Sequence, residues 1–302
     1  MHSIKKVGFP VLRVRDIDKM VAFYETKLGL QVKRRHQDDY DNAVYELGFV
    51  HIDYPEDSLL QLHHDPNAKN ASPHSAGLFH FAILVPNRES LASTYLALKN
   101  SGIYYDGFAD HLVSESLYLR DPENNGIEIY RDRPARDWPR DSEGNIMMDT
   151  LPLNLQSIVA EMDRLEGENP VAFPIGARIG HMHLKVTNLQ RSIKFYHKIL
   201  GFDITVDWRS MGAAFLSAGG YHHHVGMNTW HSMNGKVHSN DVLGLENFTI
   251  TVPDNISFFN RIRSAIPSHH FSSEEKQKEQ KSYGNQLIVS DPDGIQIVIR
   301  SE

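Results

Sequence analysis

The chain has 302 residues, and 31 Lys and Arg against 38 Asp and Glu give a formal net charge of −7. This acidic balance, without a concentrated basic run, argues against nucleic-acid binding. The absence of cysteine excludes disulfides, thiolate metal sites and cysteine nucleophiles, so a transition-metal site would be built from the 18 histidines and from carboxylates. No apolar run approaches the ~18 residues of a membrane span, and residues 1–8 do not resemble a signal peptide. We therefore expect a cytoplasmic protein without a membrane partner.

Internal repeats organise the chain. Three pairs of segments match, namely residues 8–30 with 180–202, residues 78–86 with 245–253, and residues 118–130 with 288–299. Such self-similarity indicates that related structural units recur along the chain. These units, which we name repeats 1 to 4, start near residues 7, 78, 179 and 244.

Each repeat is predicted to open with a short strand. In repeat 3, Met182 and Leu184 alternate along one apolar face, which leaves His181 and His183 on the opposite face. The corresponding segments of the other repeats show the same alternation of apolar positions. The first strand of each repeat is therefore expected to bury one face and to present the other to a more polar space.

A helix and further strands are predicted to follow within each repeat. In repeat 3, apolar residues recur at helical spacing over 193–200, with Thr187 or Asn188 as the cap. The remaining segments read as strands, and the last of them are the similar runs 126–130 and 294–298. The repeating order is thus strand, helix and three strands (βαβββ).

Four βαβββ repeats predict an α+β fold, in which one face of each sheet packs on helices and the other lines a cup. Repeats 1 and 2 form an N-terminal module over residues 1–132, and repeats 3 and 4 form a C-terminal module over residues 178–302. Residues 133–177, which are rich in Pro, Asp and Arg, connect the modules, and a short helix is expected near 154–165.

Four such repeats in a chain of this length resemble the vicinal oxygen chelate superfamily of glyoxalases, bleomycin-resistance proteins and type I extradiol dioxygenases. The resemblance covers residues 5–132 and 178–300. It implies two vicinal-oxygen-chelate modules, whose mixed sheets curl in pairs into cups that hold a metal on the concave face. In this superfamily the ligands come from the first and last strands of the repeats, whereas the chemistry differs among members.

A narrower resemblance lies in residues 109–128, which are similar to the extradiol ring-cleavage signature. The matching residues are His111, Leu117, Tyr118, Asp121, Pro122 and Glu128. Two positions depart from the signature, because Ala109 and Asn124 stand where glycine is usual. In addition, one residue more than usual precedes Glu128.

Residues 219–228 resemble the strand with adjacent histidines that is found in extradiol enzymes. Of the three consecutive histidines in this segment, the motif position assigns His223 to acid–base chemistry. Taken as a whole, the chain is most similar to bacterial proteins of the catechol-2,3-dioxygenase type.

The ligand positions of the superfamily fall on few residues of this chain. The first-strand positions are Phe9, His80, His181 and Asn247, and the last-strand positions of repeats 2 and 4 are Glu128 and Gln296. Pairing repeat 1 with 2 and repeat 3 with 4 leaves each cup without three good ligands. Pairing repeat 2 with repeat 3 unites His80, His181 and Glu128, a union that a swapped dimer would also produce. Two imidazoles and one carboxylate are the ligand set of non-haem Fe(II) oxygenases, and Mn(II) suits the same donors.

Repeat 4 serves as an internal comparison for repeat 2. At the matching positions His80 is replaced by Asn247, Tyr118 by Ile288 and Glu128 by Gln296. The packing positions, such as Phe81 and Phe248, are kept. The replacements fall together on the candidate site, which favours a chemical over a packing role for these residues.

The resemblance implies an Fe(II)-dependent extradiol dioxygenase that cleaves catechol or a substituted catechol with O₂. The expected roles are metal ligation by His80, His181 and Glu128, hydrogen bonding to the substrate oxygen by Tyr118, and proton transfer by His223 or His111. One alternative is a glyoxalase-type isomerase or lyase, which usually needs a second carboxylate, and the other is a non-catalytic, ligand-sequestering protein of the bleomycin-resistance kind. Sheet-edge association, common in this superfamily, also leads us to expect a homo-oligomer.

Overall fold

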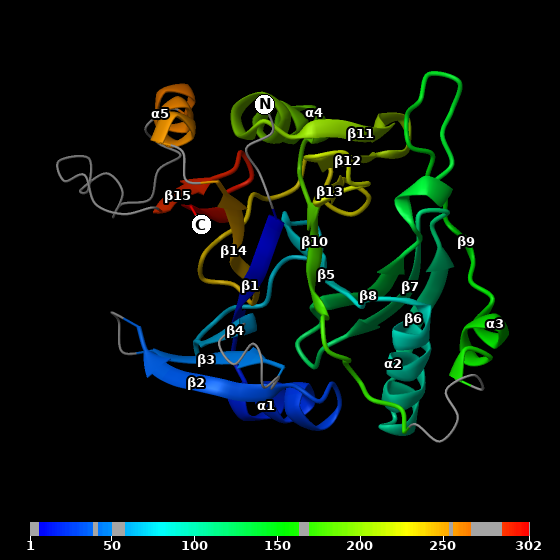
Figure 1. The fold of residues 1–302 in the computed structure, drawn as a ribbon. Coiled ribbons are helices and arrows are strands. Elements are labelled where there is room, and N and C mark those ends of the chain that lie inside the picture. Colours follow the sequence, from blue (N-terminus) through cyan, green and yellow to red (C-terminus); the bar gives the residue numbers. More distant parts are fainter. Residues whose placement is uncertain are drawn as a thin grey trace. The chain divides into compact units, whose positions relative to one another are not determined.

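The strands and helices follow the predicted repeats in a computed structural model (Figure 1). The structure describes residues 6–38, 42–49, 58–162, 169–253, 256–266 and 286–301. Each repeat opens with a strand, and these strands are β1 (Lys6–Val14), β5 (Gly77–Leu84), β10 (Arg178–Lys185) and β14 (Gly244–Val252). Among the helices within these ranges, none has the length and apolar character needed to cross a membrane.

A helix follows the first strand of every repeat. These helices are α1 (Ile17–Thr26), α2 (Arg88–Asn100), α4 (Leu189–Ile193) with its π-helical continuation η3 (Lys194–Leu200), and α5 (Ile256–Ala265). The side chains of Asp16, Asn87 and Asn188 accept a hydrogen bond from the backbone N–H three residues later, which satisfies one free donor at each helix start. Of the two candidate caps in repeat 3, the structure therefore selects Asn188.

The remaining strands complete the βαβββ order. They are β2 (Gln31–Gln37), β3 (Ala43–Gly48) and β4 (Ser58–His64) in repeat 1, β6 (Tyr105–Asp110), β7 (Ser114–Arg120) and β8 (Gly126–Asp132) in repeat 2, and β11 (Asp203–Trp208), β12 (Ala213–Ser217) and β13 (Val225–Asn228) in repeat 3. The described part of repeat 4 adds β15 (Gln286–Ser290) and β16 (Gln296–Ser301). The predicted α+β class is confirmed.

Short elements occupy the segment between repeats 2 and 3. They are η1 (Ala135–Asp137), β9 (Leu151–Pro152) and α3 (Leu155–Val159), and a further turn, η4 (Arg209–Met211), lies between β11 and β12. Helix α3 lies within the range predicted for a helix and begins after Asn154, whose side chain accepts from the Ser157 N–H. Residues 163–168, which include the end of that predicted range, lie outside the described residues.

Within the described residues, the strands form two mixed sheets. In this part of the chain, one sheet has seven strands in the order β15-β16-β14-β1-β4-β3-β2, and the other has nine in the order β11-β12-β13-β10-β5-β8-β7-β6-β9. In the nine-stranded sheet, β5 runs parallel to β8 and β10 runs parallel to β13, while β7 and β8 are antiparallel. The first and last strands of repeats 2 and 3 are thus neighbours in this sheet.

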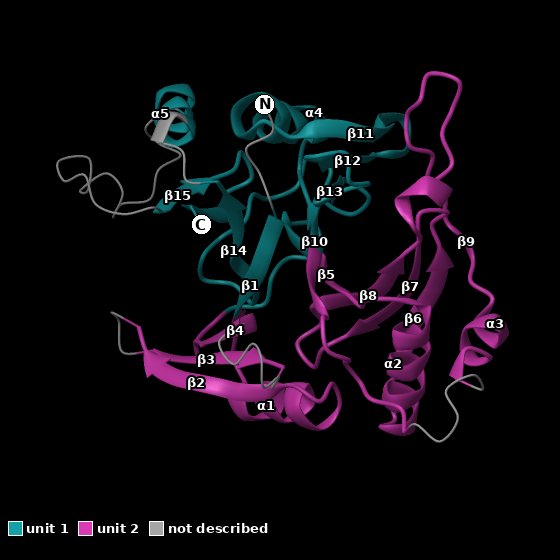
Figure 2. Cartoon of the chain, viewed as in Figure 1, with its two compact units in different colours: residues 1–12, 69–79, 181–302 teal, residues 13–68, 80–180 magenta. Residues whose placement is uncertain are grey.

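Residue contacts divide the chain into two compact units (Figure 2). Unit 1 comprises residues 1–12, 69–79 and 181–302, and unit 2 comprises residues 13–68 and 80–180. Within unit 2, Phe81 and Ile83 on β5 are fully buried, and within unit 1 Met182 and Leu184 on β10 are fully buried. The apolar faces predicted from alternation therefore form the cores.

A buried tyrosine–aspartate pair recurs in both units. The Tyr24 hydroxyl donates to Asp121 at 2.9 Å in unit 2, and the Tyr196 hydroxyl donates to Asp291 at 3.1 Å in unit 1. Burial raises the pKa of Asp121 to about 6. Burial, followed by the charge of Asp293, raises the pKa of Asp291 to about 7. These pairs connect the helix of one repeat to the Asp-Pro turn of the next, which gives a physical reason for the recurrence of these residues.

Candidate metal centre

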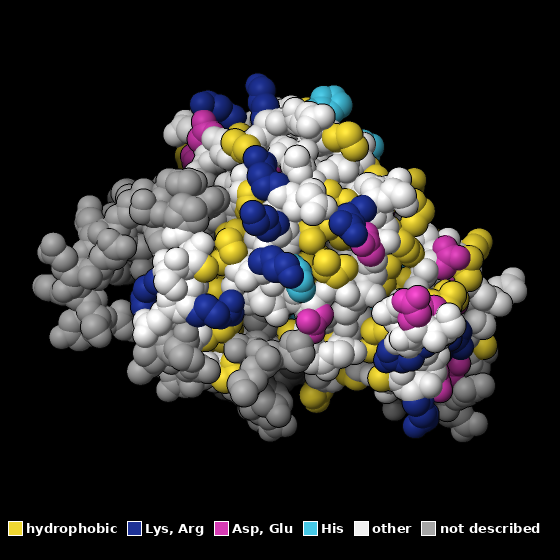
Figure 3. Space-filling model, turned by 90° about the horizontal axis from the view of Figure 1, so that it is seen from above, with side chains coloured by type: hydrophobic (Ala, Val, Ile, Leu, Met, Phe, Trp, Pro, Cys, Tyr) yellow, Lys and Arg dark blue, Asp and Glu magenta, His cyan; other side chains and the backbone are white. Residues whose placement is uncertain are grey.

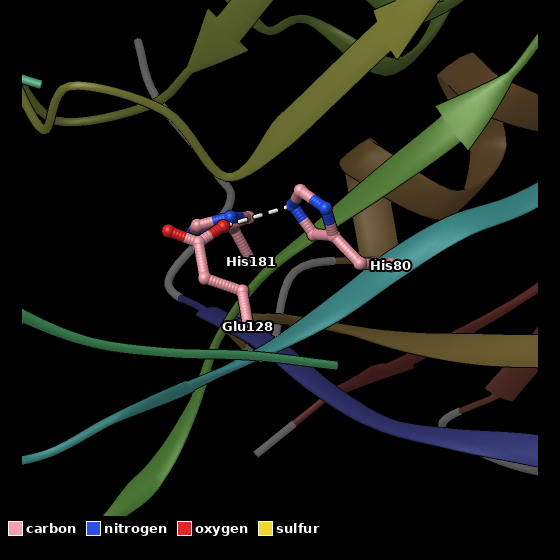
Figure 4. Close-up of side chains that lie close together, drawn as sticks. All are labelled: His80, Glu128 and His181. Carbon is pink, nitrogen blue, oxygen red and sulfur yellow. Dashed lines mark ion pairs between the residues drawn. The ribbon is translucent and has the colours of Figure 1, made fainter. Parts of the chain in front are cut away.

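Three of the predicted site residues converge in the structure. One ring nitrogen each of His80 and His181 and one carboxylate oxygen of Glu128 all lie within 4.8 Å of one another, and Figure 4 shows the three side chains turned toward one another. Within this group, His80 Nε2 lies 2.9 Å from Glu128 Oε2. Among the residues that the structure describes, this is the group of His, Asp and Glu side chains that lies close enough to hold a metal ion.

The register of β5 and β8 places His80 and Glu128 on one face of the sheet. Glu128 lies opposite Ala82, and His80, two residues before Ala82, projects to the same face. The intervening Phe81 points into the apolar core and is fully buried. Since side chains alternate along a strand, this register presents the imidazole and the carboxylate together.

His181 follows a glycine that the packing requires. A Cβ atom at Gly180 would overlap the hydroxyl of Tyr130, so only glycine allows β10 to approach this tyrosine. Tyr130 itself is fully buried beside Ala82 and Leu84. The close approach fixes the backbone immediately before His181.

The donor set fits a divalent transition metal. His80, Glu128 and His181 are 6%, 3% and 1% exposed, so the carboxylate charge is held away from water and needs a compensating positive charge. Imidazole nitrogen and carboxylate oxygen are donors that suit Fe(II) and Mn(II). The chemistry and burial of the three side chains therefore match a 2-His-1-carboxylate centre.

Tyr118 and His111 lie beside this group. Tyr118 on β7 is directly opposite Glu128 on β8, and its ring centroid lies 5.7 Å from that of His80. The Tyr118 hydroxyl is 2.7 Å from His111 Nε2. Burial of the hydroxyl, and then the charge of Glu128, raises the pKa of Tyr118 well above its ordinary value. Tyr118 consequently keeps its hydroxyl hydrogen at neutral pH.

The tautomer of His111 follows from its two contacts. Its Nδ1 lies 2.8 Å from the carbonyl oxygen of Asp149, which can only accept, so Nδ1 carries the hydrogen. In the neutral ring Nε2 is then an acceptor for the Tyr118 hydroxyl. The turn before β7 places His111, and within it Leu112 adopts a φ of 69°, a left-handed conformation that is uncommon for this residue type.

His223 lies next to His181 within unit 1. The ring centroids are 4.0 Å apart, and the Phe215 ring packs against His223 at 5.0 Å. His223 is 5% exposed and belongs to the segment just before β13. The adjacent His224 instead bonds Ser217 Oγ through its Nδ1, so consecutive histidines have different neighbours.

The sequence analysis did not identify the aromatic side chains that surround His183. His183 lies two residues beyond His181 on β10, and its ring contacts those of Phe79, Phe215 and Trp230 at centroid distances of 4.9, 5.7 and 6.0 Å. A Cβ at Gly226 would come within 3.0 Å of the His183 ring, so this glycine makes room for the imidazole. The alternation along the strand predicted that His183 lies on the polar face. It could not predict the aromatic neighbours of His183, because these come from segments far away in the sequence.

Repeat 4 presents neutral side chains where repeat 2 has ionisable ones. Asn247 on β14 lies directly opposite Gln296 on β16. Neither amide carries a charge, and both are weaker metal ligands than imidazole or carboxylate.

Few histidine side chains reach the surface on the face drawn in Figure 3, where basic, acidic and apolar side chains are interspersed. Among the residues that the structure describes, the group that could hold a metal ion is the buried one of Figure 4.

Comparisons with known proteins agree with this geometry. A family model described as the Glyoxalase/Bleomycin resistance protein/Dioxygenase superfamily matches residues 6–129 and 178–299. The chain is 37% identical over 254 residues to the catechol-2,3-dioxygenase of Bacillus subtilis (strain 168), covering 84% of this chain and 85% of the relative. It is also 30% identical over 127 residues to biphenyl-2,3-diol 1,2-dioxygenase 3 of Rhodococcus globerulus, covering 41% and 62% of the two chains. A solved structure of a putative dioxygenase from Bacillus subtilis subsp. subtilis str. 168 shares the fold, with a TM-score of 0.64, 11% identity and coverage of 100% of this chain and 86% of the other.

Proposed function

The chain belongs to the glyoxalase/bleomycin resistance protein/dioxygenase superfamily, and within it we propose an extradiol dioxygenase that opens catechol or a substituted catechol with O₂. The observation that carries the proposal is the convergence of His80, Glu128 and His181 beside Tyr118. The relative with 37% identity bears the name of this activity. A ligand-sequestering protein would not need a buried carboxylate between two imidazoles.

We assign the metal to His80, Glu128 and His181, with Fe(II) as the ion and Mn(II) as one that suits the same donors. A divalent ion held by these three residues would act as a Lewis acid that lowers the pKa of a catechol hydroxyl. The strand order β13-β10-β5-β8 supports the pairing of repeats 2 and 3 that unites these ligands. Each ligand then comes from the first or last strand of a repeat.

Tyr118 orients the substrate in this proposal. Its raised pKa keeps the Tyr118 hydroxyl protonated, and in the absence of substrate its single hydrogen is donated to His111 Nε2 at 2.7 Å. When His111 Nε2 has taken up a proton released by the catechol, it donates to the Tyr118 oxygen, and the Tyr118 hydroxyl can then donate its own hydrogen to the anionic catechol oxygen. The carbonyl of Asp149 fixes the ring of His111 for that role.

In this proposal His223, next to the ligand His181, transfers protons as well. The centroids of the His223 and His181 rings lie 4.0 Å apart, so His223 is next to a proposed ligand but is not itself one of the three ligands. The aromatic side chains around His183 supply flat apolar surfaces near the same ligand, and such surfaces suit an aromatic ring. Holding the diol in one orientation raises the rate because the entropic cost of bringing the reacting groups together is met when the substrate binds.

The proposal is tested by loading the full-length protein with Fe(II) without oxygen and then adding catechol and air. We expect oxygen uptake and a yellow ring-opened semialdehyde, both lost in His80→Ala and Glu128→Gln. A protein that only sequesters its ligand would bind catechol without consuming oxygen, and an isomerase or lyase would act on its substrate without oxygen. Bound Fe(II) without oxygen uptake for any of a panel of substituted catechols would refute the proposal.

A further inference from the structure

We propose that His222 is a positioning residue for His223, an inference that rests on the proposed function of the site. His222 is fully buried and His223 is 5% exposed. Their Nδ1 atoms lie 2.7 Å apart, with ring centroids at 4.7 Å and ring planes at 61°. This distance is that of a hydrogen bond, and it joins two neighbouring side chains that are both removed from water.

The bond determines which nitrogen of His223 can serve the site. Two imidazole nitrogens at this separation share one hydrogen, because two N–H groups or two lone pairs facing each other would repel. Whichever ring donates, the two Nδ1 atoms engage each other. His223 therefore exchanges a proton with the site through Nε2, and a 180° rotation of its ring would break the bond.

The main chain and the side chain of His222 are each held in place. The Thr205 hydroxyl donates to the His222 carbonyl oxygen at 2.6 Å. The Tyr221 ring packs on the His222 ring with centroids 4.1 Å apart. On its other side, His223 lies against Phe215 and His181. The hydrogen bond thus connects an anchored imidazole to one whose orientation matters for the reaction.

His224 provides a matched comparison on the same segment. It is 9% exposed, and its Nδ1 accepts from the Ala218 N–H at 3.3 Å and lies 2.9 Å from Ser217 Oγ. It is therefore a buried, hydrogen-bonded histidine like His222. Ser217 and Ala218, to which it is hydrogen-bonded, are not residues of the candidate site.

The experiment compares two amide substitutions at one position. In asparagine the amide is attached to Cγ, as Nδ1 is in histidine, so His222→Asn can keep the bond to His223. In His222→Gln the amide lies one carbon further out and cannot occupy the same place. For the Fe(II)-loaded enzyme we expect His222→Gln to lower kcat about tenfold to a hundredfold, with KM for catechol changed much less. His222→Asn is expected to restore most of kcat, and His224→Gln to leave it near the wild-type value.

A second measurement reports on the bond without turnover. In the full-length protein labelled with ¹⁵N-histidine and loaded with diamagnetic Zn(II), the His223 Nδ1 resonance should show a hydrogen bond to nitrogen. The signal should shift in His222→Gln and return in His222→Asn. Absence of this bond in the wild type, an unchanged kcat in His222→Gln, or an equal loss in His224→Gln would each overturn the inference. If the wild-type protein does not cleave the ring, the proposed function is refuted, and with it any role of the bond in that function. The His223 Nδ1 resonance would still decide whether the bond exists.

Discussion

Replacing Glu128 by glutamine tests the metal centre through binding rather than turnover. The substitution keeps the shape of the side chain but removes its negative charge, and the amide oxygen can still accept a hydrogen bond from His80. The Glu128 carboxylate is 3% exposed and lies 2.9 Å from His80 Nε2. Its charge is therefore poorly screened by water and acts almost fully on a cation held nearby.

The size of the effect follows from the cost of removing a buried charge. Loss of one partner of a buried ionic interaction costs about 3–5 kcal/mol, and about 3 kcal/mol corresponds to roughly a hundredfold weaker binding constant. At a metal concentration of about 100 times Kd, the wild type is stabilised by about 2.7 kcal/mol. The same concentration would then only equal the Kd of Glu128→Gln and stabilise it by about 0.4 kcal/mol.

Thermal unfolding with and without Mn(II) measures this difference. For a chain of this size we expect the metal to raise Tm by about 4 °C in the wild type and by less than about 1 °C in Glu128→Gln. Gln296→Ala is the matched control, because this residue occupies the corresponding strand of repeat 4 opposite Asn247. It should leave the metal-dependent shift unchanged. Equal shifts in wild type and Glu128→Gln would refute the ligand assignment.

Three further predictions concern the surrounding structure. Tyr118→Phe should lower kcat for catechol about tenfold to a hundredfold while leaving the Mn(II)-induced rise in Tm intact, and a loss of that rise would contradict a role confined to the substrate. Gly180→Ala should destabilise the protein by about 1–3 kcal/mol in urea unfolding because its Cβ would meet the Tyr130 hydroxyl. An unchanged midpoint would show that the two are not packed this closely. Burial raises the pKa of Asp291 from 3.8 to about 7, so the folded state keeps a proton that the unfolded chain releases, and stability falls as the pH rises from about 4 through about 7. Asp291→Asn should reduce that fall by up to about 1.4 kcal/mol per pH unit, and an identical pH profile would argue against the buried acid.

Most of the fold was predictable because repetition and alternation are properties of the local sequence. The opening strands of all four repeats lie where the aligned segments placed them. Met182 and Leu184 are buried and His181 faces the opposite side, as a period of two requires. The division into modules of residues 1–132 and 178–302 stays a prediction.

The candidate ligands were also identified from the sequence, although through resemblance rather than periodicity. The comparison of repeat 2 with repeat 4 added weight, because His80 and Glu128 have neutral counterparts in Asn247 and Gln296. The convergence of His80, Glu128 and His181 in space could not be derived in this way. It depends on strand pairing between segments far apart in the chain, which no local pattern specifies.

Side-chain contacts between distant segments were beyond the reach of the sequence. The recurrence of Tyr24 and Asp121 was visible, but their hydrogen bond was not. The orientation of His223 likewise depends on its bond to His222 and on the ring of Phe215. A run of three histidines cannot reveal which ring turns to which neighbour, because rotamers follow tertiary packing.

We propose that this protein inserts both atoms of O₂ into a catechol at the centre formed by His80, Glu128 and His181. Mass spectrometry of the product formed by the Fe(II)-loaded full-length protein under ¹⁸O₂ tests it most directly. We expect a ring-opened product that carries two ¹⁸O atoms and does not form with Glu128→Gln. Unlabelled product, or labelled product formed equally by Glu128→Gln, would contradict it.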